Sequence, residues 1–551
     1  MTILPPQGKE NKILFLIAFL IMLSVAFIQC YKTTHDLHWS LDADFYRDMA
    51  YIQGILEGHF GKDPNISGAY LWYNPLLVSI EALIAKISGL PINEVVMQSG
   101  TYLNLLAPLA FFIMLSVLFD FKIALASSLS FLFLASGNIP GFDAATYSPW
   151  LYPVCFNQFL FYLNIILCYK AFSAQKYFWF ILLGASIGIN FLGHTAPALI
   201  MILIMASIQS QRIFQSLKEK TYALLKKYLM QGVVTFLFFV IASFPLLYFI
   251  IGKYHLQFKN RFPFEYVDTI FIWHNIADMI KVNFSVSFII AVIGFIWFYR
   301  NFRQALLRKI ILNWLFIAVI MFIYSTIVAS ADRHFNIHLP GTVPSFHYFY
   351  YLKALQSVFF GFGFLFLIRV LYSWIDNFFH RKIKIFANGK YTNEVLILAV
   401  LLYAAINLPS YINRFDFVYY REQILIKEKE KDRIDAYHFI VQNIPSDKVI
   451  LCEAGDPSLF PVMPTGRKMV SIGISYSNPY VDFGSRETDR NNMILFLKTG
   501  QPLSAKGLFD AYHVSFVLLS NVEIEKSNGL QQVLGQPIYK NNLYTLFDLK
   551  M

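Results

Sequence analysis

The sequence predicts an α-helical polytopic membrane protein with about 11 transmembrane helices and a small extracytoplasmic α/β domain at its C-terminus. Of the 551 residues, 57% are apolar and 14% are charged, whereas soluble domains average about 45–50% and about 25%. Long apolar runs fill the chain to about residue 411, and charges return beyond residue 415. These observations exclude an ordinary soluble enzyme, a disordered chain and, with four cysteines, a disulfide scaffold.

Each predicted span is an apolar run close to the 20 or so residues that cross a bilayer. The first run is a retained span rather than a signal peptide, because no small-residue cleavage site follows it. The run 177–210 is long enough for two short spans, with His194 and Thr195 at their turn. The other runs are 13–31, 96–119, 122–138, 150–170, 229–251, 283–299, 310–330, 348–374 and 394–411.

Segment 73–90 is apolar but carries Glu81 and Lys86, and the charge pattern decides whether it crosses. Clusters of Lys and Arg are expected on the cytoplasmic side. With the N-terminus inside, an even number of spans must separate the first long loop from the next outer loop, 139–149. Segment 73–90 is therefore predicted to lie along the outer surface as an amphipathic helix. The basic clusters that set this count are 211–228, 300–309 and 381–390.

Two parts follow from this topology. Residues 1–414 form the transmembrane domain, with the first outer loop at 32–95, and residues 415–551 form the extracytoplasmic domain. That domain reads as one helix followed by short strands at 448–452, 469–474, 513–519 and 543–548. We expect a multi-pass plasma (inner) membrane protein with a cytoplasmic N-terminus. The net charge of +11 is explained by cytoplasmic loops, so no nucleic acid partner is expected.

The first outer loop opens with Asp36, Asp42, Asp44 and Asp48 directly after a span. Asp44 and Asp48 share one helix face, while Asp42 and Asp44 stand where that helix begins, as an acidic N-cap does. Capping and solvation are one interpretation. The other is a catalytic base or a metal-binding pair at the membrane surface.

Further candidates lie on the same predicted face, and each has a structural alternative. Tyr73 either anchors the surface helix at the headgroups or shapes a lipid-facing cavity. His194, in an apolar turn, is a candidate as an intramembrane ionisable group. Basic side chains at the outer interface either snorkel or grip a lipid phosphate. The remaining candidates are Asp143, Arg261, Arg333, His334 and Lys353.

The layout resembles the GT-C superfamily of membrane glycosyltransferases, which includes protein mannosyltransferases, aminoarabinose transferases and oligosaccharyltransferases. The shared features are the acidic motif Asp42-Ala43-Asp44-Phe45-Tyr46, the surface helix opened by Tyr73-Asn74-Pro75-Leu76, and an acid, Asp143, in the second outer loop. The sequence departs from the family at Ala43, where an Asp-Glu pair would have its second acid. The Trp-Trp-Asp-Tyr-Gly motif of oligosaccharyltransferases is absent.

The resemblance implies a polyprenyl-phosphate sugar as donor, a cell-envelope acceptor (lipid, glycan or protein) and an inverting hexosyl or pentosyl transfer. Asp44, or Asp42, would be the base, and Asp143 would orient the acceptor. Asp44 and Asp143 would also hold a divalent cation (Mg or Mn), if one is used. Arg333, Lys353 and Arg261 would hold the donor phosphate, with His194, Tyr73 and His334 lining the cavity.

Two other functions stay open at this point. A transporter or flippase of lipid-linked glycans predicts ionisable groups along a path through the bundle, and a scaffold predicts that the acids lie apart in solvent. No Walker A motif or GxGxxG loop is present, so no nucleotide cofactor is expected.

Overall fold

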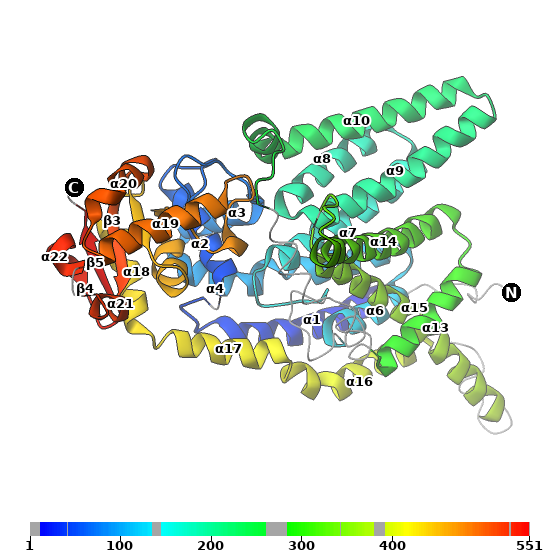
Figure 1. Cartoon of the computed structure of the whole chain (residues 1–551). Helices are drawn as coiled ribbons and strands as arrows, with labels where there is room; N and C mark the ends of the chain where they lie inside the picture. The colour runs from blue at the N-terminus through cyan, green and yellow to red at the C-terminus, as the bar shows by residue number, and fades with distance from the viewer. Residues whose placement is uncertain are drawn as a thin grey trace. The chain divides into compact units, whose positions relative to one another are not determined.

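The protein is a predominantly helical membrane chain that ends in a five-stranded sheet (Figure 1). The computed structural model describes residues 12–40, 42–134, 145–260, 284–341, 343–379, 392–527 and 530–549. Multiple apolar helices and a small C-terminal sheet confirm the predicted fold class.

The chain divides into two compact units. Unit 1 comprises Met1–His35, Gly100–Ser243 and Asp268–Tyr419. Unit 2 comprises Asp36–Ser99, Phe244–Val267 and Tyr420–Met551. Most of the predicted first outer loop thus belongs to the same unit as the C-terminal domain, and the boundary at residue 414 stays a prediction.

Unit 1 holds most of the apolar helices. In the described part of the whole chain, eight helical stretches are long and apolar enough to cross a membrane, and three shorter apolar helices accompany them. Each predicted span overlaps one of these eleven stretches. The helices are α1 (Lys12–Thr34), α4 (Ile92–Leu103), α5 (Leu106–Leu118), α6 (Phe121–Phe133), α7 (Pro153–Ala174), α8 (Tyr177–Gly193), α9 (Thr195–Lys218), α10 (Tyr222–Leu247), α13 (Val286–Asn301), α14 (Ala305–Phe335), α15 (Ser345–Phe379), α16 (Thr392–Ile412) and α17 (Phe415–Lys427).

Helix α15 packs against α6, α13 and α14. Its contact with α13 is made backbone to backbone through two glycines. A Cβ on Gly363 would lie 1.9 Å from the carbonyl oxygen of Ile290, and one on Gly294 would lie 1.8 Å from that of Phe359. Small residues are the usual means of close helix packing in membranes, where there is little hydrophobic drive between helices.

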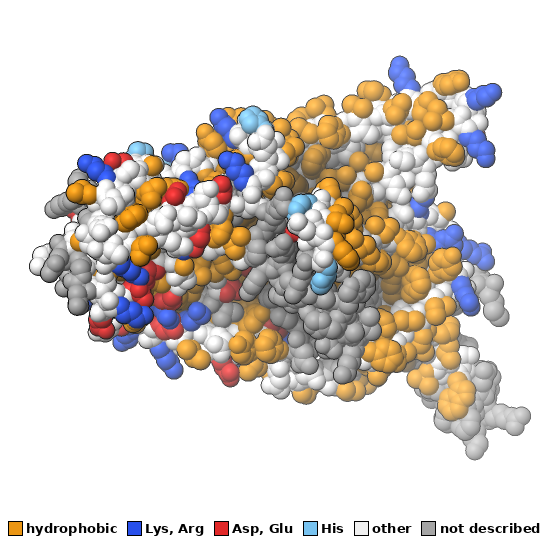
Figure 2. Space-filling model, in the orientation of Figure 1, with side chains coloured by type: hydrophobic (Ala, Val, Ile, Leu, Met, Phe, Trp, Pro, Cys, Tyr) orange, Lys and Arg blue, Asp and Glu red, His pale blue; other side chains and the backbone are white. Residues whose placement is uncertain are grey.

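Several helix ends meet at one end of unit 1. The Nζ of Lys12 lies 5.6 Å from the ring centroid of Phe121, which joins the start of α1 to the α5–α6 turn. One cavity is lined by both the α5–α6 and α13–α14 turns, and another by the end of α9 and the start of α14. Lys and Arg side chains gather at this end in Figure 2, while hydrophobic side chains cover the helices. The basic clusters 211–228 and 300–309 therefore lie at the same end of unit 1, and cluster 381–390 lies outside the described residues.

Unit 2 contains α2 (Ala43–Leu56) and α3 (Leu76–Ser88). Helix α3 has 13 residues, or about 20 Å at 1.5 Å per residue, which is less than a bilayer core. The amide of Gln98 donates to the carbonyl oxygen of Leu37 at 3.0 Å. The chain from Leu37 to Gln98 thus returns to its starting point, which supports a surface position for α3.

The C-terminal part of unit 2 is built on one sheet with strand order β2-β1-β3-β5-β4. Strands β1, β2 and β3 are parallel, and β5 is antiparallel to both β3 and β4. Its apolar core includes Leu451, Met493 and Val517. The elements are α18 (Lys431–Asn443), β1 (Val449–Cys452), η3 (Ser458–Val462), η4 (Met463–Thr465), β2 (Lys468–Met469), η5 (Ile474–Tyr476), α19 (Phe483–Lys498), η6 (Pro502–Ala505), α20 (Lys506–Tyr512), β3 (Val514–Ser520), α21 (Asn521–Glu525), α22 (Leu530–Leu534), β4 (Pro537–Lys540) and β5 (Tyr544–Asp548).

Helix α2 packs against α3 and against η4 of the C-terminal part. Gly466, at φ +67°, lets the chain pass α2, since a Cβ there would lie 3.0 Å from the carbonyl oxygen of Ala50. Arg467, almost fully buried, pairs with Glu57 at 2.8 Å. The C-terminal part is thereby fastened to the helix that carries the candidate acids.

Candidate functional site

Helix α2 begins at the acidic motif, and Asp42 caps it. Oδ1 of Asp42 accepts hydrogen bonds from the backbone N–H groups of Asp44 at 3.0 Å and Phe45 at 3.4 Å. An aspartate in this position satisfies amides that have no partner within the helix. Oδ1 of Asp42 therefore caps α2, whereas the side chain of Asp44 lies in the first turn of the helix.

Arg47 ties together the groups around Asp44. Its Nη1 donates to Oδ1 of Asp44 at 2.8 Å, its Nε donates to Oδ1 of Asp48 at 3.0 Å, and its Nη2 donates to the hydroxyl of Tyr73 at 2.8 Å. The guanidinium carbon also lies 3.8 Å from the centroid of the Tyr73 ring. A planar fork of donors suits such a site, because one side chain binds several oxygens in fixed directions.

The charged side chains around Arg47 differ in their exposure to solvent. The side chain of Asp44 is 44% exposed, whereas those of Arg47 and Asp48 are 10% and 3% exposed. Burial raises the pKa of Asp48 to about 6, although the Arg47 guanidinium opposes the shift. Burial by itself would lower the pKa of Arg47, but Asp48, Tyr73 and Asp44 outweigh it and raise that pKa. Asp44 is thus the accessible carboxylate at the edge of a buried charged network.

Glu81 of α3 is a second buried acid beside this network. Its residue is 1% exposed, and its Oε2 has no hydrogen-bond partner among the described residues. Burial raises the pKa of Glu81 well above its ordinary value, and the charge of Asp48 raises it further. Burial of this kind favours the neutral carboxyl over the carboxylate.

Sequence reasoning did not select Arg47, Asp48 or Glu81 as site residues. The spacing of Asp44 and Asp48 indicated a shared face, and a carboxyl within an otherwise apolar surface helix marked Glu81 as unusual. No comparable signal pointed to the bond between Arg47 and Tyr73, which are 26 positions apart.

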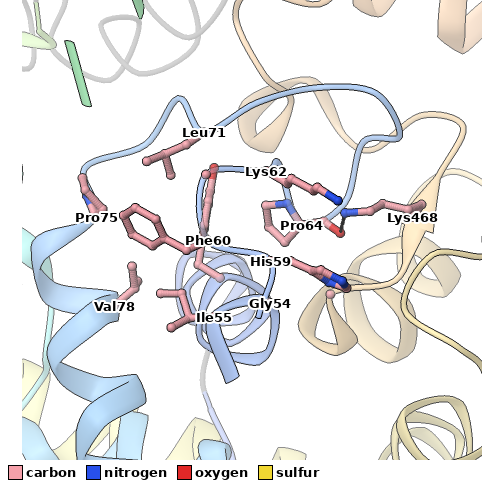
Figure 3. A pocket seen from close by; sticks show the side chains of 13 residues that line it. Gly54, Ile55, His59, Phe60, Lys62, Pro64, Leu71, Pro75, Val78 and Lys468 are labelled. Atoms are coloured by element: carbon pink, nitrogen blue, oxygen red, sulfur yellow. Dashed lines mark hydrogen bonds between the residues drawn. The ribbon is translucent and has the colours of Figure 1, made fainter. Parts of the chain in front are cut away.

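A small cavity of about 10 Å³ lies between the loop after α2 and the C-terminal part of unit 2 (Figure 3). His59, Lys62 and Lys468 are among the side chains that line it. Nζ of Lys468 donates to the backbone oxygens of Asp63 at 2.6 Å and Pro64 at 3.0 Å. This volume has room for about one water molecule. The cavity is therefore a small packing gap between two segments of unit 2 and is too small for a substrate.

In unit 1, His194 separates α8 from α9 and caps α9, since its Nδ1 accepts from the backbone N–H of Ala196 at 3.3 Å. The ring centroids of His194 and His347 are 4.6 Å apart, and His347 stands at the start of α15. The buried His194 and the partly buried His347 thus meet, and the predicted turn at His194 is where α9 begins.

Lys353 lies on α15 and is 8% exposed. Its Nζ donates to Oε1 of Gln356 at 2.9 Å. The two side chains line a cavity of about 360 Å³ whose other walls are apolar residues of α13, α14 and α15, such as Phe295, Val319 and Phe359. The groove thus combines one cation with walls that are otherwise almost entirely apolar.

The remaining predicted residues are placed less fully. Asp143 and Arg261 lie outside the described residues, and Arg333 is described only as part of α14. His334 is exposed near the end of that helix, and Asn336 follows in the left-handed conformation at φ 52°. His338 lies beyond the end of α14 and pairs with Asp332.

No group of three or more His, Cys, Asp and Glu side chains that could hold a metal ion occurs in the described part of the chain. Asp44 and Asp48 both face Arg47, so a divalent ion bound between them would compete with the guanidinium. The predicted pair of Asp44 and Asp143 stays a prediction.

No protein-family model matches the sequence, and no curated protein matches it. Solved structures do match. The archaeal oligosaccharyltransferase AglB from Archaeoglobus fulgidus, in complex with an inhibitory peptide and a dolichol-phosphate, is 14% identical, with a TM-score of 0.53 over 92% of this chain and 70% of that one. ArnT from Cupriavidus metallidurans bound to undecaprenyl phosphate is 12% identical, with a TM-score of 0.51 over 96% of this chain and 97% of that one. The apo state of ArnT gives 10% identity and a TM-score of 0.54 over the same shares.

AglB and ArnT are both membrane glycosyltransferases of the GT-C superfamily. The resemblance inferred from the sequence is therefore confirmed at the level of the fold. Identities of 10–14% establish a shared architecture alone.

Proposed function

We propose that this chain, which has the fold of the GT-C membrane glycosyltransferases, transfers a sugar from a polyprenyl-phosphate-linked donor to a cell-envelope acceptor. One observation carries the proposal. An accessible carboxylate, Asp44, stands in the first turn of α2, held by the buried Arg47 in the loop that follows the first span. The solved relatives add support, because AglB was seen with dolichol-phosphate and ArnT with undecaprenyl phosphate.

Asp44 is the proposed base. Arg47 binds Oδ1 of Asp44, which leaves Oδ2 to accept the proton of an acceptor hydroxyl. The hydroxyl oxygen then bonds to the anomeric carbon of the donor sugar, and the bond from that carbon to the phosphate oxygen breaks. Polyprenyl phosphate leaves with the electron pair. A single displacement of this kind inverts the anomeric centre.

Lys353 is the proposed contact for the donor phosphate. A protonated amine beside the phosphate would offset the charge that develops on the leaving oxygen. The apolar walls of its groove suit the polyprenyl chain, which gains from leaving water. Arg333 and Arg261 are proposed as helpers, as the sequence suggested, and a Mg or Mn ion at Asp44 and Asp143 belongs to the same proposal.

The acceptor is proposed to approach from the extracytoplasmic side of a plasma (inner) membrane. Tyr73 belongs to this proposed acceptor region, because its hydroxyl binds the same guanidinium as Asp44. His194 and His334 remain proposed cavity residues. The C-terminal domain is proposed to present the acceptor, since it is fastened to α2 through Arg467 and Glu57.

The test supplies purified full-length protein in lipid with a panel of labelled polyprenyl-phosphate sugars and an envelope extract as acceptor. Release of polyprenyl phosphate is followed for wild type, Asp44→Asn and Asp42→Asn. Removal of a general base typically costs about 10²–10⁴-fold in rate, so Asp44→Asn should lose turnover while donor binding survives. Asp42→Asn should retain turnover in proportion to its folded fraction.

Asp482→Asn is the matched control, because Asp482 caps α19 in the C-terminal part as Asp42 caps α2. Turnover that persists in Asp44→Asn refutes the assigned base. Movement of the labelled lipid across the bilayer without cleavage, unchanged by Asp44→Asn, would replace the enzyme with a carrier of lipid-linked glycans.

A further inference from the structure

A second large cavity lies in unit 1, at the end where the basic turns meet. It has a volume of about 840 Å³, within the range of about 300–1,000 Å³ that is usual for ligand pockets. It is bounded by the α5–α6 turn, the α13–α14 turn and the last part of the membrane-spanning stretch of α15. The proposed chemistry of Asp44 and Lys353 does not use this cavity.

Four arginines line the cavity, and one acid accompanies them. Arg300 lies in the last turn of α13, Arg303 lies in the turn that follows, Arg308 lies in the first turn of α14, and Arg369 comes from α15. The acid is Asp120, whose carboxylate caps α6 by accepting from the backbone N–H of Ile123 at 2.8 Å.

No ion pair in the described part of the chain involves the first three of these arginines. The formal charge of the lining is therefore +3, four arginines against one aspartate. Such a concentration of guanidinium groups attracts an anion, and each guanidinium can bind two oxygens of a phosphate.

The floor of the cavity is aromatic and closely packed. Phe302, in the turn between the arginines, stacks on the buried Phe298 at 4.8 Å and meets Phe119 at 5.4 Å. Phe362 of α15 lies 5.1 Å from Phe119 and 5.7 Å from Trp297. These contacts hold the turn against three helices, so the arginines stand on a fixed frame rather than on a loose loop.

Cations over an apolar floor, at the end of membrane-spanning helices, match a ligand with a phosphate group and a hydrocarbon body. We propose that this cavity binds the headgroup of an anionic phospholipid from the leaflet on the side of the basic turns. Basic pockets between transmembrane helices bind anionic lipid headgroups by this chemistry. Arginines that only set the topology or snorkel to the interface would not need to converge on one cavity, as these four do.

The test measures binding of phosphatidylglycerol to the purified full chain by native mass spectrometry across lipid concentrations. The pocket variant is Arg303→Gln with Arg369→Gln. The control is Lys218→Gln with Lys226→Gln, which removes the same charge from exposed side chains of α9 and α10 outside the cavity. Both variants lose the general attraction of cations for anionic lipid.

The pocket variant should bind at least about tenfold more weakly than the control, because charge-assisted hydrogen bonds are lost as well. Arg303→Lys with Arg369→Lys keeps the charge but loses the planar fork, and should also bind more weakly than wild type. This conservative pair, with its melting temperature measured without lipid, separates lost binding from lost folding.

Three outcomes would overturn the proposal. Equal losses of phosphatidylglycerol affinity in the pocket and control variants would mean that the lipid responds only to the surface charge of the protein. If the protein bound phosphatidylcholine as tightly as phosphatidylglycerol, the net charge of the lipid would play no part in binding. Full competition by inorganic phosphate at equal concentration would identify a site for a free anion rather than a lipid.

Discussion

Replacement of Arg47 by lysine tests the network that holds Asp44. The guanidinium donates to Asp44, Asp48 and Tyr73 from three different nitrogens. An ammonium group on a flexible stem keeps the charge but reaches at most one of the two carboxylates. At least two hydrogen bonds involving a charged group are then lost, each contributing about 1.5–3 kcal/mol.

The expected loss of stability is about 3 kcal/mol, near the lower end of that sum. Asp48 limits the loss, since its pKa is already raised to about 6 by burial and it can take up a proton rather than remain an unpaired carboxylate. For a domain of about 150–250 residues, each kcal/mol shifts the melting temperature by roughly 2–4 °C. Arg47→Lys should therefore melt about 6–12 °C below wild type in the same lipid.

Arg421→Lys provides the matched control. Arg421 also grips a carboxylate with two nitrogens, at 2.6 Å and 2.7 Å from the oxygens of Asp36, but the pair is exposed. Exposed ion pairs contribute about 0–1 kcal/mol, so this variant should melt close to wild type. If the two variants melt together, the buried network does not stabilise unit 2 as argued. Turnover should fall in Arg47→Lys beyond its loss of folded protein, because Asp44 loses its fixed orientation.

Two further predictions concern pH and helix packing. The pKa of Asp48 is raised from 3.8 to about 6, so the folded state binds this proton more tightly than the unfolded state. The free energy of unfolding therefore falls as the pH rises from about 4 through 6. The loss is about 3 kcal/mol, because each pKa unit corresponds to 1.36 kcal/mol. Asp48→Asn should remove this pH dependence, which melting curves at pH 4.5 and 7.5 will measure. If the variant and wild type lose the same stability between these pH values, Asp48 is not the source. Gly363→Ala places a Cβ 1.9 Å from the carbonyl oxygen of Ile290, so α13 and α15 must separate at a cost of about 1–3 kcal/mol. Gly232→Ala, with open space around the new Cβ, is its control, and equal melting of the two would contradict the close packing.

The membrane architecture could be predicted from the sequence because its cause is local. A run of apolar residues crosses a bilayer whatever its neighbours are, since every backbone group is satisfied within the helix. The turn at His194 and the beginning of α2 at Asp42 were predicted for similar reasons, whereas the surface position of segment 73–90 was predicted from the charge pattern of the whole chain. Caps, breaks and hydrophobic lengths are properties of adjacent residues.

The composition of the candidate site depended on packing between distant segments. The sequence indicated Asp44 as a site residue but not its partner Arg47. An arginine one turn further along a helix gives no functional signal by itself, and only the structure shows that Tyr73 and Asp48 surround it. It also marked Glu81 as unusual, but not that burial would leave one of its oxygens without a partner.

By itself, the sequence determined that the chain spans the membrane many times, that an acidic helix follows the first span and that a small α/β domain ends it. Only the tertiary structure decided that Phe244–Val267 joins the first loop and the C-terminal part in one unit. It alone brought four arginines around one cavity. Hydrophobic length and helix capping act over a few neighbouring residues, whereas the pairing of charges across segments is set by which surfaces pack together.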